Sequence, residues 1–221
     1  VSTDLLKSDL DAGCKLYLQP VGLGVEGERL AGGWRHFLGI RLTTRTQSGD
    51  VESSLYNLSE FDQFLKLPEV AALHENLTAK RSVFGRLSMD KPHLMAILNV
   101  TPDSFSDGGD NYQSHKAIEQ ALQMDKDGAS ILDIGGESTR PGAEDVSVEV
   151  EVRRVEPVIS SLQGKVKASI SIDTRNPETM AKAVAAGADF INDVTALEHS
   201  ERSMSAAVRA QKPLFLMHMK G

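Results

Sequence analysis

The stretch HLMAILNVTPDSFSDGG, residues 93–109, decides the fold of this chain. It begins with a short unbroken apolar run over 94–98, which fits a strand buried on both faces of a parallel sheet. The run ends at Asn99, and a polar loop rich in serine, aspartate and glycine follows. An α/β barrel presents its active-site groups in this way, at the ends of buried strands that lead into long loops. By pattern alone, an ordinary strand and turn fit equally well.

Downstream of this stretch, strand-like apolar runs alternate with helical patterns. The predicted strands are 93–99, 130–134, 169–173, 190–193 and 214–219, and the predicted helices are 114–128, 146–162, 177–186 and 200–210. Short connections between consecutive strands favour a parallel α/β sheet with right-handed crossovers. An open doubly wound sheet and an incomplete (β/α)8 barrel both fit this periodicity.

Residues 1–90 are a separate region, for which the sequence predicts a small α+β module. Strand-like composition covers 15–18, 37–44 and 51–58, and helices are predicted over 59–65 and 68–80. The module carries no recognisable metal-ligand cluster, phosphate loop or nucleophile motif, and the single histidines His36 and His74 are expected to be structural or solvent-facing. Residues 81–91 are polar enough to form a linker. The role of this region stays open.

Composition and charge limit the classes of function. The chain has 221 residues, of which 40% are hydrophobic and 25% are charged, as in ordinary soluble globular proteins. A net charge of −7 argues against a nucleic-acid surface, because phosphate contacts need lysine and arginine. Cys14 is the single cysteine, which favours an intracellular, cytoplasmic protein. No apolar run reaches the ~18 residues that span a bilayer, and the acidic N-terminus does not resemble a signal peptide.

Polar residues gather where the predicted strands end. They are Asn99, Asp133, Asp173, Asn192, Asp193 and His218. A single polar residue in an apolar run is usually a hydrogen-bonded core residue, because an unpaired polar group costs free energy there. Several at equivalent strand ends point instead to a site at the C-terminal face of a barrel.

The types of these residues suit a ligand with adjacent N–H donors, such as an aminopyrimidinone ring. A carboxylate such as Asp173 can accept two donors, and an amide such as Asn192 can both donate and accept. A helix N-cap before Asn176 is the alternative role for Asp173. Asn99 offers a neutral oxygen that suits a hard cation retaining several waters.

Two motifs in this half of the chain resemble the signatures of the dihydropteroate synthase family. LNVTPDSFSDGG at 98–109 resembles the first signature of that pterin-binding family, and ILDIGGESTRPG at 131–142 resembles the second. They stand in the right order and about one βα unit apart. The resemblance covers roughly 91–221 and implies a (β/α)8 TIM barrel with about five βα units present, incomplete at its C-terminus, after the extension of residues 1–90.

The resemblance also implies roles for residues at the strand ends. Asp173 and Asn192 match pterin-contacting positions, and Met217 matches a position that packs along the same pocket. Asn99 matches an asparagine that binds Mg²⁺ together with pyrophosphate, so Mg²⁺ is the implied cofactor.

Two loops are implied to fold over the substrates, namely 100–109 and 135–142. Phe105 and Pro141 would border the p-aminobenzoate ring, and Thr139 and Arg140 would lie near pyrophosphate. The residues implied to act in catalysis are Asp107, Thr139 and Arg140. Glycines at both loops supply the backbone freedom that opening and closing require.

The implied activity is the condensation of 6-hydroxymethyl-7,8-dihydropterin pyrophosphate with p-aminobenzoate, which gives 7,8-dihydropteroate and pyrophosphate in folate biosynthesis. Such a transferase is a sulfonamide target and is expected to be a cytoplasmic homodimer. A pterin-dependent methyltransferase and a truncated, non-catalytic pterin-binding module are the alternatives. The family's cationic residues from later strands lie after Gly221, so residues 1–221 alone are expected to be inactive and, with two apolar edge strands, poorly soluble.

Overall fold

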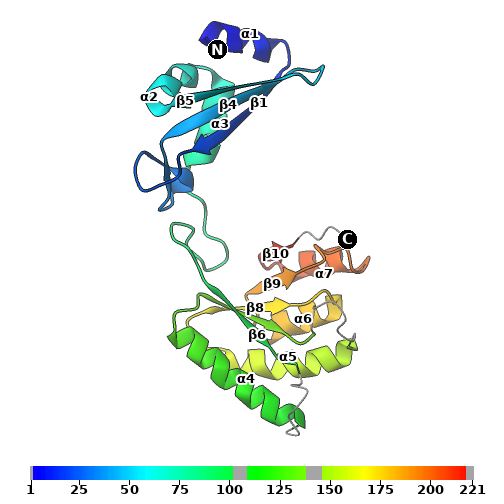
Figure 1. Ribbon diagram of the computed structural model, residues 1–221. Coiled ribbons are helices and arrows are strands. Elements are labelled where there is room, and N and C mark those ends of the chain that lie inside the picture. Colours follow the sequence, from blue (N-terminus) through cyan, green and yellow to red (C-terminus); the bar gives the residue numbers. More distant parts are fainter. Residues whose placement is uncertain (1, 102–108, 138–145, 218–221) are drawn as a thin grey trace. The chain divides into compact units, whose positions relative to one another are not determined.

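The computed structural model describes residues 2–101, 109–137 and 146–217 (Figure 1). The chain divides into two compact units. One consists of Val1–Val83 and Ser88–Pro92, and the other consists of Phe84–Leu87 and His93–Gly221. The stretch 81–91 is therefore not simply a linker, because four of its residues pack within the second unit.

The first unit is built on a three-stranded antiparallel sheet in the order β1-β4-β5. Its strands are β1 (Lys15–Val21), β4 (Gly39–Arg45) and β5 (Val51–Asn57), with a small hairpin of β2 (Glu28–Arg29) and β3 (His36–Phe37). Its helices are α1 (Thr3–Asp11), η1 (Leu30–Gly32), α2 (Leu58–Phe61), η2 (Asp62–Lys66) and α3 (Pro68–Thr78). The buried core of the unit comprises Leu6, Phe37, Ile40, Leu42, Phe61, Phe64, Leu67 and Val70.

Two local features of this unit bear on the predictions. Helix α1 was not predicted, although Ser2 caps it by accepting a hydrogen bond from the backbone N–H of Leu5 at 3.2 Å. His74 is largely buried, and its Nε2 lies 2.9 Å from Oε2 of Glu28. This pair joins α3 to β2, which is a structural role for His74.

The second unit is built on a five-stranded parallel sheet in the order β10-β9-β8-β7-β6 (Figure 1). Its strands are β6 (Met95–Asn99), β7 (Ile131–Gly135), β8 (Ser169–Asp173), β9 (Phe190–Asp193) and β10 (Leu214–Leu216). The connecting helices are α4 (Gly109–Lys126), α5 (Val148–Leu162), α6 (Pro177–Ala186) and α7 (Ser203–Ala210). The alternation predicted from the sequence is confirmed, with shifted ends.

Two of the shifted helix starts have a local cause that the structure shows. Helix α5 begins at Val148 rather than 146, because Ser147 accepts a hydrogen bond from the backbone N–H of Val150 at 3.4 Å and caps it. Helix α7 begins at Ser203 rather than 200, because Ser200 forms a turn: its hydroxyl accepts the backbone N–H of Arg202 at 3.2 Å, and its carbonyl accepts that of Ser203 at 2.9 Å. Helix α4 begins at Gly109, earlier than the predicted Ser114.

The two faces of the parallel sheet differ in what they carry. One face packs against the helices, and its buried residues include Leu132, Ile134, Ile170, Ile172 and Ile191. The opposite face carries Ile131 and Phe190, which pack with Leu87 near the N-terminal ends of the strands. Successive side chains of a strand point to opposite faces, so the polar residues between these apolar ones share the second face.

The segment 84–87 closes the apolar end of that second face. Phe84 and Leu87 exchange backbone hydrogen bonds of 2.9 and 3.0 Å, which folds the segment into a tight bridge. The ring of Phe84 lies 5.4 Å from that of Phe190 and 5.2 Å from that of Phe215, between centroids. Gly85 has a φ of +61°, and a Cβ there would lie 2.6 Å from Cζ of Phe190, so glycine is required.

Among the helices of the described ranges, none combines the length and the apolar character that crossing a membrane requires.

Candidate active site

The site is organised by the register of the parallel strands. Register pairs Asn99 with Gly135, Gly135 with Asp173, and Asp173 with Asn192. These four residues therefore form one row across four strands, at the C-terminal edge of the sheet. The structure thus brings together Asn99, Asp173 and Asn192, which the sequence singled out separately.

Gly135 leaves a gap in the middle of this row. A Cβ at Gly135 would lie 3.6 Å from Oδ2 of Asp173 and 3.8 Å from Oδ1 of Asn99. The two oxygens therefore border the space that the missing side chain leaves free. A planar ligand or a cation that approaches this edge of the sheet would meet both oxygens.

Asp173 is the most perturbed acidic group of the site. Burial raises the pKa of its carboxyl to about 7, and repulsion from Asp133, Glu151, Asp193 and Glu137 adds to the effect. Its Oδ1 is buried and has no hydrogen-bond partner in the part of the chain that the structure describes. A buried carboxyl with a shifted pKa and an unused oxygen is a strong candidate for ligand binding.

The alternative role of Asp173 as a helix cap is wrong. The residue at the N-cap of α6 is Asn176, and Thr174 accepts the backbone N–H of Asn176 with its Oγ1 at 3.1 Å. Asp173 ends β8 three residues earlier and contributes no cap. Its carboxylate is therefore left for another partner.

The sequence predicts Asp133 at a strand end, and this is wrong. Asp133 lies in the middle of β7, two residues before Gly135. Its side chain is buried, and its Oδ2 accepts a hydrogen bond of 2.8 Å from Nδ2 of Asn192. Burial raises the pKa of the Asp133 carboxyl, against the opposing effect of its hydrogen bonds. Asp133 thus holds Asn192, which belongs to the row, by a hydrogen bond from the middle of β7.

Asp193 has a structural role instead. Its buried Oδ1 accepts hydrogen bonds of 2.8 Å from both the backbone N–H and the hydroxyl of Thr195, and its Oδ2 accepts one of 3.0 Å from the backbone N–H of Leu197. These bonds order the turn after β9. Met217 follows β10, and its backbone N–H donates to the carbonyl of Asp193 at 3.2 Å. Its place along a pterin pocket stays a prediction.

Several predicted site residues lie outside the described residues, and their roles stay predictions. They are Phe105, Asp107, Thr139, Arg140, Pro141 and His218.

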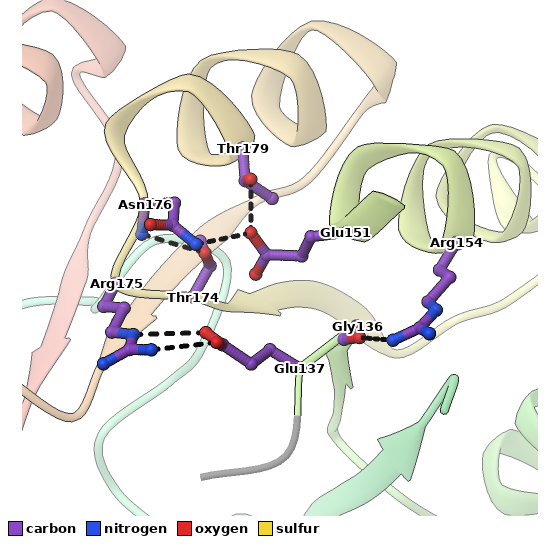
Figure 2. Close-up of polar contacts among 8 residues, drawn as sticks. All are labelled: Gly136, Glu137, Glu151, Arg154, Thr174, Arg175, Asn176 and Thr179. Atoms are coloured by element: carbon purple, nitrogen blue, oxygen red, sulfur yellow. Dashed lines mark hydrogen bonds and ion pairs between the residues drawn. The ribbon is translucent and has the colours of Figure 1, made fainter. Parts of the chain in front are cut away.

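A network that was not predicted from the sequence holds the start of the second loop (Figure 2). Arg154 on α5 donates from Nη1 to the carbonyl of Gly136 at 2.7 Å. Arg175 donates two hydrogen bonds to the carboxylate of Glu137, of 2.9 Å from Nη2 and 3.2 Å from Nε. Arg175 lies two residues after Asp173, so this bidentate pair ties the loop to the strand end that carries the candidate carboxylate.

A second part of the network joins the helices behind the site (Figure 2). Glu151 on α5 is fully buried, and its Oε2 accepts hydrogen bonds from Nδ2 of Asn176, at 2.9 Å, and from the hydroxyl of Thr179. The carboxylate thus fixes the first turn of α6 against α5. Asn176 follows directly after Arg175. The hydrogen bond that packs α6 against α5 and the ion pair that holds the start of the second loop are therefore made by neighbouring residues.

We expect Arg175→Ala to destabilise the fold by about 2–3 kcal/mol, because it leaves the buried Glu137 carboxylate without its cation. The side chain of Glu137 is 7% exposed and that of Arg175 is 29% exposed. Arg202→Ala is the matched control, since its ion pair with Glu178 is 71% and 43% exposed and contributes under about 1 kcal/mol. Urea unfolding of both variants would measure this, and equal losses would contradict it.

Two adjacent glycines should respond differently to alanine. At Gly136 a Cβ would lie 2.8 Å from Cγ1 of Val155 and 3.1 Å from the carbonyl oxygen of Glu151, so Gly136→Ala should cost about 1–3 kcal/mol of stability through overpacking. At Gly135 the new methyl group would meet only ordinary contact distances, so stability should change by less than about 1 kcal/mol. Chemical unfolding of the two variants side by side decides this.

The predicted metal ligand Asn99 lies on the row, at the end of β6. Within the described ranges, no group of three or more histidine, cysteine or acidic residues is placed to hold a metal ion. Asn99 supplies one amide oxygen, which fits a hard cation whose other ligands come from water and from the phosphate oxygens of a substrate.

Comparison with known proteins gives consistent results. The sequence profile of the family described as "Pterin binding enzyme" matches residues 95–221. The dihydropteroate synthase of Escherichia coli K12 is 46% identical over 135 residues, which cover 61% of this chain and 48% of that protein. The folic acid synthesis protein fol1 of Schizosaccharomyces pombe is 47% identical over 158 residues, 71% of this chain and 21% of that protein. The chain spans about half the length of the bacterial relative.

Solved structures show the same similarity. A dihydropteroate synthase of Xanthomonas albilineans with 4-aminobenzoic acid matches with a TM-score of 0.57 and 50% identity, over 61% of this chain and 49% of that one. The same enzyme in complex with 7,8-dihydropteroate matches with a TM-score of 0.53 and 46% identity, over 61% and 48% of the two chains. The predicted fold class is thereby confirmed, because the second unit corresponds to part of a (β/α)8 TIM barrel.

Proposed function

This chain belongs to the family of pterin-binding enzymes, and from that premise we propose that the complete protein is a dihydropteroate synthase. The observation that carries the proposal is the row at the strand ends, where the partly buried carboxylate of Asp173 lies in register with the amide of Asn192, beside the gap at Gly135. The similar Xanthomonas albilineans structures contain 4-aminobenzoic acid and 7,8-dihydropteroate, which supports the same substrate class here.

The chemistry of the row suits the polar edge of a pterin ring. Asp173 offers a carboxylate that can accept ring N–H donors, and Asn192 adds an amide next to it. Bound N–H donors would favour the ionised form of Asp173, whose pKa of about 7 makes this group responsive near neutral pH. Oδ1 of this carboxylate is already shielded from water in the fold, so ligand donors that reach it gain charge-assisted hydrogen bonds.

The proposed reaction forms one bond and breaks one bond. The amine nitrogen of p-aminobenzoate bonds to the methylene carbon of 6-hydroxymethyl-7,8-dihydropterin pyrophosphate, while the carbon–oxygen bond breaks and pyrophosphate leaves with the electron pair. The amine then loses a proton to water. Asn99 would hold Mg²⁺ through its amide oxygen in the described part of the chain, and the bound cation would supply positive charge for the pyrophosphate group.

The row itself would orient the pterin so that its methylene carbon faces outward from the strand ends. The anchors on Gly136 and Glu137 would hold the start of the second loop beside the same edge. We propose that the complete protein is a cytoplasmic homodimer on the strength of family membership alone.

The test is an assay of pyrophosphate release with the complete protein that carries this chain. We expect release only when the pterin pyrophosphate and p-aminobenzoate are both present, and loss of release in Asp173→Ala. Gly135→Ala should raise the Michaelis constant for the pterin substrate while the protein stays folded, because its methyl group fills the gap between Asn99 and Asp173. Transfer of a methyl group in place of pyrophosphate release would identify the alternative methyltransferase.

A further inference from the structure

A hydrogen bond between Asn192 and Asp133 determines which way the side-chain amide of Asn192 is turned. Nδ2 of Asn192 lies 2.8 Å from Oδ2 of Asp133, and the two residues are 59 positions apart in the chain. An ionised carboxylate can only accept hydrogen bonds, so the amide atom that faces it must be the nitrogen. The oxygen of the same amide, Oδ1, is then available to accept a hydrogen bond from a ligand.

We propose that Asp133 is a positioning residue for the pterin site: it locks the side-chain amide of Asn192 so that the site presents two neighbouring acceptors, Oδ1 of Asn192 and the carboxylate of Asp173. The proposal rests on the proposed function, because it assumes that these two side chains face the pterin. Register places Asp173 directly beside Asn192, so the two acceptors come from adjacent strands at the same level of the sheet.

The location of Asp133 supports a specific role over a general structural one. Asp133 is 4% exposed, in the middle of β7, and its carboxylate is held by the side chains of Asn192 and Ser171. Burying a carboxylate without a cation costs stability, and here the charge also repels Asp173. A neutral or apolar residue would serve the packing of β7 better. What Asp133 adds over such a residue is an obligatory acceptor for one atom of Asn192.

The lock determines which ligand edge the site accepts. With the amide held, a ring that offers two adjacent N–H donors satisfies both acceptors. With the amide free to turn over, the site would present a donor beside an acceptor for part of the time, and a donor edge would leave a buried group unpaired. Asp133 is thus a specificity-determining residue that does not itself need to touch the ligand.

A double-mutant cycle on the complete protein tests the proposal, with 6-hydroxymethyl-7,8-dihydropterin as the calorimetric probe. We expect Asp133→Asn to weaken probe binding about tenfold, because the new amide no longer dictates how Asn192 is turned. In an Asn192→Ala background the same substitution should change affinity less than twofold, because the group it positions is gone. Asp125→Asn is the matched control, since the Asp125 carboxylate accepts the backbone N–H groups of Lys167 and Ala168 away from the row.

The outcomes separate the two proposals. Wild-type protein that does not bind the probe would overturn the proposed function, and this inference with it. Wild-type binding together with an equal effect of Asp133→Asn in both backgrounds would overturn the positioning role alone, because a purely structural residue acts independently of Asn192. Unchanged affinity in Asp133→Asn would do the same.

A measurement on the wild type keeps the inference testable even where Asp133→Asn does not fold. In protein labelled with ¹⁵N-asparagine, the side-chain amide of Asn192 is assigned by its loss in Asn192→Ala. We expect one of its protons to be shifted downfield and protected from exchange, without any ligand, as a hydrogen bond to a buried carboxylate requires. An ordinary, rapidly exchanging amide signal would overturn the lock.

Discussion

Asp173→Ala is expected to weaken pterin binding by about 10- to 100-fold while the fold is retained. The side chain is partly buried at the end of β8, and its buried Oδ1 has no partner in the described part of the chain, so alanine would remove few stabilising contacts. A bound pterin would instead lose a charged acceptor and keep its ring donors buried and unpaired. Calorimetric titration of the complete protein with a pterin measures the loss.

A control for this substitution is available on the same sheet. Asp189 accepts the backbone N–H of Ile170 with Oδ2 at 3.0 Å, near the N-terminal end of the strands. Asp189→Ala should reduce stability and leave pterin affinity unchanged. Undiminished affinity in Asp173→Ala would remove that residue from the site, and equal losses of affinity in both variants would point to general damage.

Asp173→Asn is expected to stabilise the free protein at pH 8, by up to about 4 kcal/mol. The pKa of the Asp173 carboxyl is raised from 3.8 to about 7 in the fold, so the folded state holds a proton that the unfolded state releases. Stability of the wild type therefore falls as pH rises from about 4 to about 7, and the full penalty is present above that window. Asparagine has no charge to bury and escapes the penalty.

Denaturant unfolding of the wild type and Asp173→Asn at pH 4.5 and pH 8 would measure this effect. The difference between the two proteins should be small at the lower pH and large at the higher one, which cancels contributions from other groups. A constant difference would mean that the Asp173 carboxyl is not the group that titrates. Together with the binding experiment, the result would show that this residue is retained against its cost to stability, as functional residues often are.

The architecture of the second unit could be predicted because its signals are local. The apolar run over 94–98 marks the strand β6, and proline and glycine at the ends of α6 mark a helix. The expected burial of β6 on both faces is wrong for the described chain, because β6 lies at the edge of the sheet and Ile97 is 65% exposed. Strand ends shifted by up to three residues, since the sequence shows where apolar residues are but not where backbone pairing stops. The apolar pattern of α5 is interrupted by Glu151, which faces the core, where its hydrogen bonds to α6 compensate for burial.

The candidate site was predictable only in part, for a different physical reason. Residue type and strand position were enough to select Asn99, Asp173 and Asn192, which register then places in one row. The pairs that support this row join residues far apart in the chain, such as Arg175 with Glu137. No local pattern encodes such pairs, because they depend on the order of strands in the sheet. Asp133 was selected, but its place in mid-strand and its partner became evident only in the structure.

The bridge of Phe84 and Leu87 has a consequence for how this protein is made. Its aromatic partners Phe190 and Phe215 belong to β9 and β10, which the ribosome produces more than 100 residues later. At bacterial or eukaryotic translation speeds, that interval is on the order of 5–20 s. During this interval the ring of Phe84 lacks its two aromatic partners. Strands β6 to β8 must then assemble before these aromatic contacts can form. Contacts of such long range slow folding, so the nascent chain passes through a stage in which a chaperone has apolar surface to bind.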